Sequence, residues 1–506
     1  MLRFSWATGA LQRERILPIR TGTFDSQTVH DLLRLQHMET HLVEAARKHP
    51  DYLDWRSEQQ LRYALSFARL TAFQPGAAAK GGRTNGRQDV DVAEEPVLRV
   101  RGDILDHLDK SLHGELEPRK RLKEARMALP HLLPVLRESR RRLLEIHASD
   151  FSARELDDEV GKKTLVSVAG GGGGAGYVYI GAYEALDQAG ITPGYIIGAS
   201  IGAVIGLFRA KTKKFDFDAD VALAKSLKFD DVFRFVSVKV KYGLPGLMRL
   251  FLHAGIQKRF TLPEGRWMHL PDLQIPYEAV VAGVWKGAMK NSPEEYGRAH
   301  HLNVTRRPSR LALGRMIAEQ LVRMVAFFNP MLVKEIVIGG DELTSTFDAV
   351  DAAGFSAAVP GILHYDVARN DSHMHQILDE LLKREEVSCL IDGGVANNVP
   401  VRTAWHQVQG GKIGTRNCIY LGFDCFHPSW ALRHVWLQAI TRIVQLQVAA
   451  NRPYAHEIVQ FAPTLSPANL LPRAEKIDRA VGWGRDQMKQ HLSLVRGLLE
   501  PVEWVE

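Results

Sequence analysis

The first 160 residues alternate apolar and polar positions with the period of an α-helix. From residue 26 to about residue 73, segments such as TVHDLLRLQHMETHLVEAARKH repeat apolar residues at spacings of three and four, which places them on one helix face. A second block, PRKRLKEARMALPHLLPVLRESRRRLLEIHA, is helical and arginine-rich, and we expect a solvated basic face there. Pro130 and Pro134 predict a break or kink in this block. Residues 74–95 lack an apolar period and predict a flexible loop or linker.

The pattern changes at Lys163. The apolar run TLVSVA predicts a buried strand, and after it come a block of glycines, a helical stretch that ends at Gly190, a second strand in GYIIGAS and a further helix in IGAVIGLFRA. This order is typical of a largely parallel sheet covered by helices. Later strands are predicted in IPYEAVVAGVW, KEIVIGG, VSCLIDGG and RNCIYLGFD. We therefore predict an α/β domain over residues 161–426, between a mostly helical region at 1–160 and a helical region at 427–506.

The composition and charge of the chain narrow the possible number of domains and the possible partners. The chain has 506 residues, of which 45% are hydrophobic, enough for a large core and too many for one ordinary domain. Its formal net charge of +7 fits an anionic partner such as a phospholipid surface, and we predict no nucleic-acid partner. The cysteines Cys389, Cys418 and Cys425 have no C-x-x-C spacing, which favours reduced thiols in a cytosolic setting.

The sequence predicts peripheral contact with membranes. No window holds 18 uninterrupted apolar residues, and the first residues lack the apolar core of a Sec signal peptide. We therefore expect a cytoplasmic or peripheral membrane protein, and export as an effector by another route is not excluded. The segment LPGLMRLFLHAGIQKRF combines apolar and basic residues, so it predicts either a cover over a site or lipid contact, or an amphipathic helix packed on the core.

The first candidate for chemistry is Ser200, in the G-x-S-x-G sequence that starts at Gly198 and ends at Gly202. It follows an apolar strand and precedes an apolar helix, as a nucleophile elbow requires. A serine on such a sharp turn needs glycine at the flanking positions, because side chains there would collide with neighbouring backbone. The alternative is that Ser200 only caps the following helix.

The second candidate is the run of five glycines from Gly170 to Gly174. It formally matches G-x-G-x-x-G at Gly171, Gly173 and Gly176. The next strand, however, lacks the acidic residue that would hold a ribose, and no Lys-Ser or Lys-Thr pair follows as in a phosphate-binding loop. What remains is a row of backbone amides that can stabilise an oxyanion.

The third candidate is Asp392, followed by Gly393 and Gly394 at the end of a predicted strand. An acid at that position can reach a site at the sheet edge, although Asp-Gly is also a common turn. Together the three motifs resemble the patatin-like phospholipase family, over roughly residues 164–424. The segments SAAVPGIL and NNVPV also look like family segments.

The resemblance implies a three-layer α/β fold and a Ser–Asp dyad that hydrolyses acyl lipids without metal or cofactor. Carried over, Ser200 is the nucleophile and Asp392 the base, which desolvation would make a better proton acceptor. The family's oxyanion loop falls on Gly171, Gly172, Gly173, Gly174, Ala175 and Gly176. The family usually has Arg or Lys where this chain has Ala175. A cation there would help orient the loop, so Ala175 leaves the amides alone or requires a cation from elsewhere.

Two other interpretations stay open on the sequence alone. An α/β-hydrolase triad would need a histidine after Asp392, and His406, His427 and His434 satisfy that order. A weak or inactive lipid-binding protein on the same scaffold would account for Ala175. The expected substrate is a membrane phospholipid, with triacylglycerol, lysophospholipid and galactolipid as alternatives. The N-terminal region is a candidate for binding a protein activator or for forming a homo-oligomer.

Overall fold

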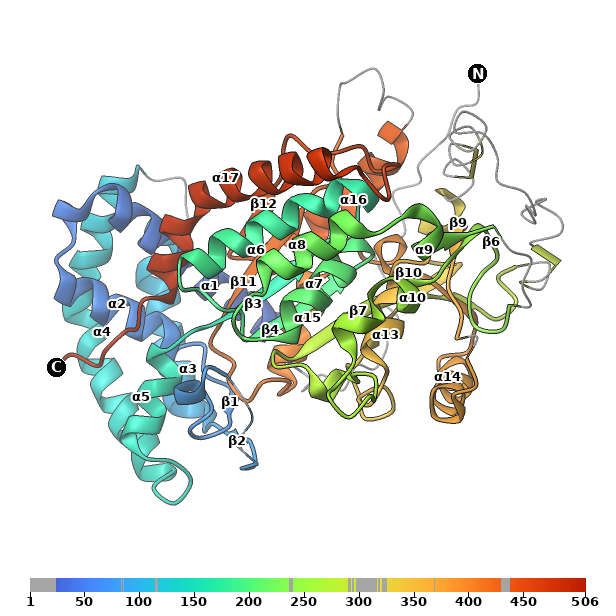
Figure 1. Ribbon diagram of the computed structural model, residues 1–506. Coiled ribbons are helices and arrows are strands. Elements are labelled where there is room, and N and C mark those ends of the chain that lie inside the picture. Colours follow the sequence, from blue (N-terminus) through green and yellow to red (C-terminus); the bar gives the residue numbers. More distant parts are fainter. Residues whose placement is uncertain are drawn as a thin grey trace, which may run out of the picture.

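A mixed, seven-stranded sheet forms the centre of the molecule (Figure 1). This computed structural model describes residues 24–82, 84, 86–113, 117–235, 240–289, 293, 295–296, 316, 319–320, 325–367, 369–428 and 437–506. The strands of the sheet are β3 (Thr164–Ala169), β4 (Tyr195–Ala199), β7 (Tyr277–Trp285), β8 (Val333–Ile338), β10 (Val387–Asp392), β11 (Cys418–Asp424) and β12 (Glu457–Gln460). Their order is β10-β7-β4-β3-β11-β12, and β8 pairs with β7 as well.

Most neighbouring strands in this sheet are parallel. β12, β11, β3, β4 and β7 pair in parallel, whereas β8 and β10 run antiparallel to β7. The predicted largely parallel sheet is therefore confirmed, together with each of the six strands expected from the sequence. β12 was not expected, because its four residues, EIVQ, are too few for a clear period.

Alternate residues of the central strands face two helical layers, as the period of two requires. Leu165 and Ala169 of β3 belong to a core cluster with α6 (Val178–Gln188) and α17 (Ala474–Leu499). Val166 and Val168 belong to another cluster with α15 (Val401–Gln409) and α16 (Gln438–Asn451). The domain thus has three layers, namely the sheet and a helical layer on each face. In the layer that contains α6, helix α17 packs along α6 (Figure 1).

The remaining helices and strands connect and cover these layers. The helices are α7 (Ile201–Lys211), α8 (Phe217–Ser226), α9 (Phe229–Val232), α10 (Leu252–Ile256), α13 (Ala349–Ser356) and α14 (Ser372–Arg384). A smaller sheet contains β5 (Phe233–Arg234), β6 (Gly246–Leu250) and β9 (Gly361–His364). β6 and α10 lie in the segment for which an amphipathic helix was one expectation. Its first half is a strand because it pairs with both β5 and β9.

The N-terminal helices pack around a core of their own. They are α1 (Ser26–Lys48), α2 (Trp55–Phe67), α3 (Glu94–Leu108), α4 (Pro118–Ile146) and α5 (Ala153–Gly161). Between α2 and α3, β1 (Ala72–Phe73) pairs with β2 (Val90–Asp91). The part of residues 74–95 nearest β1 is packed rather than exposed, because Ala77 is fully buried. The flexibility of the whole segment stays a prediction.

The two prolines of α4 do not break it, contrary to the sequence-based expectation. Pro130 and Pro134 lie inside one helix of 29 residues. Both are exposed, so water can reach the carbonyls that lose their helical partners. The opposite face buries a leucine stripe that includes Leu129 and Leu136. Tertiary packing of this stripe outweighs the local cost of the prolines.

Residues 427–506, expected to be a helical region outside the α/β domain, belong partly to it. They contribute β12 to the central sheet and α17 to the outer layer. The end of the chain then returns to the N-terminal helices (Figure 1). Val502 donates its N–H to the carbonyl of Gly161, and the Trp504 ring lies 4.9 Å from that of Tyr63. The boundary predicted at residue 426 therefore does not separate two independent units.

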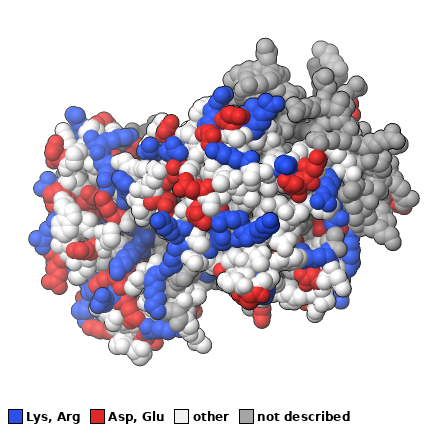
Figure 2. Space-filling model, viewed as in Figure 1, with Lys and Arg blue, Asp and Glu red and all other residues white. Residues whose placement is uncertain are grey.

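Two further features concern possible partners: the distribution of charge on the surface and the length and apolarity of the helices. Basic and acidic side chains are interspersed over the face seen in Figure 2, rather than gathered by sign. Among the helices of the described residues, none is both long and apolar enough to cross a bilayer.

Candidate functional site

Ser200 lies on the sharp turn between β4 and α7. Its backbone φ of 55° and ψ of −129° fall outside the usual regions for a residue with a side chain. The turn is held by a relay of hydrogen bonds: Ser200 N–H donates to Ser356 Oγ at 2.9 Å, and Ser356 Oγ–H donates to the Val280 carbonyl at 2.6 Å. A strained residue persists only where its surroundings fix it, and here α13 and β7 do so.

The glycines on either side of Ser200 are required by close contacts. A Cβ on Gly198 would lie 2.6 Å from Ala203 N, and one on Gly202 would lie 2.2 Å from the Ala169 carbonyl oxygen. Both neighbours are backbone atoms that cannot move aside. These contacts explain why the G-x-S-x-G sequence has glycine on both sides of the serine.

Asp392 ends β10 and meets the serine side chain. Ser200 Oγ donates to Asp392 Oδ2 at 2.5 Å, and Gly394 N–H donates to Asp392 Oδ1 at 2.8 Å. Both side chains are buried. Burial raises the pKa of Asp392 to about 7, against the opposing effect of the hydrogen bonds from Ser200 and Gly394. A carboxyl with that pKa accepts a proton far more readily than an ordinary aspartate.

The turn after Asp392 lies directly against the central sheet. A Cβ on Gly393 would lie 1.9 Å from the Val280 carbonyl oxygen, and one on Gly394 would lie 3.0 Å from Asp392 Oδ1. Glycine at both positions lets the turn approach β7 and lets an amide reach the carboxylate.

The glycine-rich loop lies beside Ser200, and only some of its amides are free. Gly171 N–H donates to the Asn398 carbonyl at 3.3 Å, and Gly174 N–H donates to the Pro467 carbonyl at 3.0 Å. The N–H groups of Gly172 and Gly173 have no acceptor among the described residues. Gly173 also has a φ of 53°, which favours glycine. Of the five glycines predicted for an oxyanion site, these two leave their amides without a partner among the described residues, and their role stays a prediction.

The other loop glycines serve close packing. A Cβ on Gly171 would lie 3.0 Å from Ser200 Cβ, and one on Gly176 would lie 2.5 Å from the Ile201 side chain. The short 3₁₀ helix η4 (Gly173–Tyr177) thereby approaches the start of α7. Backbone amides and the Ser200 hydroxyl share one small space as a result.

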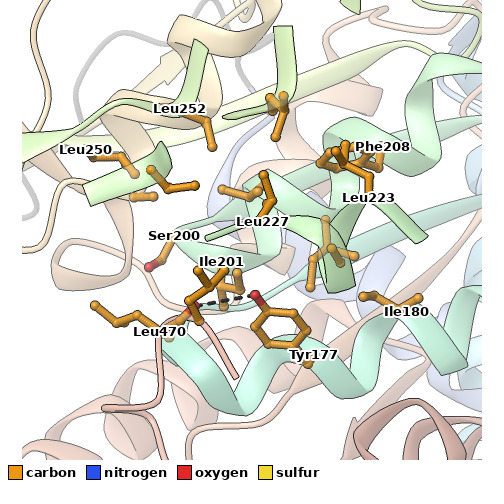
Figure 3. Close-up of a pocket in the computed structure, with 18 of the residues that line it drawn as sticks. Tyr177, Ile180, Ser200, Ile201, Phe208, Leu223, Leu227, Leu250, Leu252 and Leu470 are labelled. Atoms are coloured by element: carbon orange, nitrogen blue, oxygen red, sulfur yellow. Dashed lines mark hydrogen bonds between the residues drawn. The ribbon is translucent and has the colours of Figure 1, made fainter. Parts of the chain in front are cut away.

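An apolar cavity of about 140 Å³ begins at Ser200 (Figure 3). It follows one face of α7 through Ile201, Val204 and Phe208. Ser200 and Phe208 are eight positions apart in the chain, which corresponds to roughly 12 Å along a helix axis. Nearly all other lining side chains are aliphatic or aromatic, with Asp220 as the charged exception. A cavity of this kind suits a hydrocarbon chain attached to a group at Ser200.

None of the candidate histidines that the structure describes contacts the Ser200–Asp392 pair. The His406 ring packs near those of Trp405 and Tyr454, and burial lowers its pKa to about 4. His427 Nε2 lies 2.9 Å from the Phe461 carbonyl oxygen. His434 lies outside the described residues.

One described cluster has the residue types of a metal site. His253, Asp348 and Asp351 bring ligand atoms within 4.8 Å of one another. Arg369 already pairs with both carboxylates, at 2.6 Å from Asp351 and 3.4 Å from Asp348. Burial lowers the pKa of His253, but its bonds to the carboxylates outweigh this and raise it to about 9. Arg369 also pairs with Asp371 at 3.1 Å. The cluster is therefore an ion-pair network that joins α10 and α13.

Sequence reasoning missed three elements of the site. Ser356 fixes the Ser200 backbone, Asn398 accepts from Gly171, and residues 466–471 lie over the glycine loop. Ser356 and Asn398 fall in SAAVPGIL and NNVPV, two segments noted for their resemblance but given no role. Nothing in the sequence of residues 466–471 marks them, because their polar contacts are made by backbone carbonyls.

The sequence of the central domain matches a known protein family. Residues 167–405, just under half of the chain, match the model of the family described as patatin-like phospholipase. No curated protein matches the chain.

Proposed function

Because the central domain of this chain belongs to the patatin-like phospholipase family, whose members are lipid acyl hydrolases, we propose that Ser200 and Asp392 hydrolyse fatty-acyl esters of lipids. The observation that carries the proposal is the 2.5 Å hydrogen bond from Ser200 Oγ to Asp392 Oδ2 at the mouth of an apolar cavity.

In the proposed reaction, Ser200 Oγ attacks the ester carbonyl while its proton passes to Asp392 Oδ2. The carbonyl oxygen becomes negative, and the free amides of Gly172 and Gly173 donate to it. Such a donor typically contributes about 3–4 kcal/mol. The proton on Asp392 then passes to the departing alcohol. Water attacks the acyl-serine and gives a proton to Asp392, which passes it to Ser200 Oγ as the acyl–oxygen bond breaks and the fatty acid leaves.

The proposed substrate is a glycerophospholipid with its acyl chain in the cavity along α7. The family supports this class, and the aliphatic lining supports the acyl chain. Lysophospholipid, triacylglycerol and galactolipid esters would use the same groups. We also propose that the protein contacts the bilayer peripherally and that the lipid enters the site from the bilayer.

A fluorophosphonate probe and phosphatidylcholine vesicles test the proposal together. The wild-type protein is expected to react with the probe and to release fatty acid, because the probe reports an activated serine. Ser200→Ala should lose both activities, and Ser226→Ala, an exposed serine of α8, should keep them. Vesicle binding without labelling or release would instead identify a lipid-binding protein.

The pH dependence of kcat/KM gives a second test. Asp392 accepts a proton only as carboxylate, and its pKa is raised to about 7. kcat/KM is therefore expected to rise about tenfold per pH unit below 7 and to level off above it. The assay uses a neutral short-chain ester from pH 5 to 9, with circular dichroism to check folding. A plateau that already begins near pH 5 would contradict a raised pKa for the base.

A further inference from the structure

Position 175 supplies no cation to the glycine loop, because it is an alanine. Ala175 is fully buried in the apolar cluster that includes residues of α6 and α17. A Cβ on Gly172 would lie 3.7 Å from the Ala175 methyl group. The side chain at position 175 therefore brings no charge to the loop, and the contacts of Gly171 and Gly174 with other segments are made by backbone groups.

The strap, defined here as residues 466–471 between β12 and α17, lies directly on that loop. Its Pro467 carbonyl accepts the N–H of Gly174 at 3.0 Å. The two backbones are so close that a Cβ on Gly174 would lie 2.3 Å from the Asn469 carbonyl oxygen and 2.6 Å from that of Ser466. The contact thus consists of backbone against backbone, and it falls immediately after Gly172 and Gly173.

The strap also forms part of the cavity wall. Leu470 and Leu471 line the cavity that contains Ser200. Tyr177, at the end of the glycine loop, donates its hydroxyl to the Leu470 carbonyl at 3.4 Å (Figure 3). Loop and strap are therefore joined at two points, Gly174 and Tyr177.

Helix α17 holds the strap in place. It approaches α6 so closely that a Cβ on Gly181 would lie 1.9 Å from the Val481 carbonyl oxygen, and one on Gly484 would lie 1.8 Å from that of Val178. Arg485 pairs with Glu184 at 2.6 Å across the same interface. The chain thus runs from β12 through the strap into α17, and both of these elements belong to the domain.

We propose that the 466–471 strap is the positioning element of the oxyanion loop: it holds the free amides of Gly172 and Gly173 against Ser200, in the absence of a loop cation. The strap lies outside residues 167–405, which match the family model. This inference rests on the proposed function for its kinetic consequence, whereas the loop's dependence on the strap can be measured without activity.

Gly174→Ala tests the strap by inserting a methyl group between loop and strap. The assay compares kcat and KM for p-nitrophenyl butyrate, a short ester that does not fill the cavity, and kcat is expressed per site titrated with a fluorophosphonate. We expect kcat per titrated site to fall about 10- to 100-fold, because small displacements of oxyanion donors are costly. KM should change little. The matched control is Gly482→Ala on α17, where an added methyl group meets nothing within 4 Å.

A second pair of variants serves if Gly174→Ala does not fold. Tyr177→Phe removes the hydroxyl that donates to the strap, and Tyr179→Phe removes one on the same helical turn that donates to the Phe423 carbonyl instead. Only Tyr177→Phe should lower kcat per titrated site. The melting temperatures of the two variants should differ by less than about 3 °C.

Hydrogen exchange of a peptide covering residues 170–176 separates the two proposals. Faster exchange in Gly174→Ala than in wild type and Gly482→Ala is expected, whether or not the protein is active. Unchanged exchange together with unchanged kcat per titrated site would overturn the role of the strap. If the wild-type protein neither reacts nor hydrolyses, the proposed function fails, and the exchange result alone decides on the strap.

Discussion

Asp392→Asn is expected to lower kcat for ester hydrolysis about 1,000-fold, the range found when a general base is removed. Asparagine keeps the shape and the contact with Gly394 but cannot take a proton from Ser200 Oγ. The measurement is steady-state hydrolysis of a short-chain ester, together with the rate of fluorophosphonate labelling, which should fall in parallel.

Asp424→Asn is the matched control for this variant. Asp424 ends β11, is fully buried, and accepts from Phe426 N–H and the Gln445 side chain rather than from Ser200. Its replacement should leave kcat within about threefold of wild type. His406→Ala and His427→Ala complete the series. A histidine variant as inactive as Asp392→Asn would show that a Ser–Asp–His triad, not a dyad, does the chemistry.

Glu39→Gln is expected to lower the free energy of unfolding by about 3–5 kcal/mol, because it leaves buried cations without their anion. Glu39 of α1 is fully buried and pairs with Lys163 at 2.7 Å and with Arg69 at 2.7 Å, while Arg62 lies 3.5 Å away. Burial raises the pKa of Glu39, but these three cations outweigh it and lower the pKa to about 2. Urea unfolding followed by circular dichroism measures the loss.

The comparison for this variant lies on the same helix. Glu44 pairs with Lys48 at 2.7 Å, the same distance, but the Lys48 side chain is exposed and that of Glu44 is 44% exposed. Glu44→Gln should therefore change the unfolding free energy by less than about 1 kcal/mol. Equal changes in the free energy of unfolding for the two variants would mean that the cations around Glu39 become hydrated when Glu39 is replaced.

The sequence predicted the centre of this fold well because the signals there are local. The run TLVSVA became β3 with every residue buried, and GYIIGAS became β4 with Ser200 at its end. The pairing of Asp392 with Ser200 rested mainly on the resemblance, because 192 positions separate the two residues in the chain. The steric demand for Gly198 and Gly202 follows from the turn itself.

The parts that sequence reasoning missed depend on partners distant in the chain. Pro130 and Pro134 predicted a break or kink, yet α4 is one continuous helix that buries a leucine stripe. β12 exists because β11 offers it an open edge. The strap has no side-chain motif, and its position follows from the close packing of α17 on α6. Such features follow from three-dimensional packing and not from local propensity.

The order of synthesis gives the strap one more consequence. A ribosome completes the glycine loop about 300 residues before it reaches Pro467, which at 5–20 residues per second is a delay of roughly 15 to 60 s. During that interval the growing chain already holds Ser200, and later Asp392, but the amides beside them are not yet restrained. Under the proposed function and the proposed role of the strap, a nascent chain is therefore a poor esterase until α17 has folded onto α6.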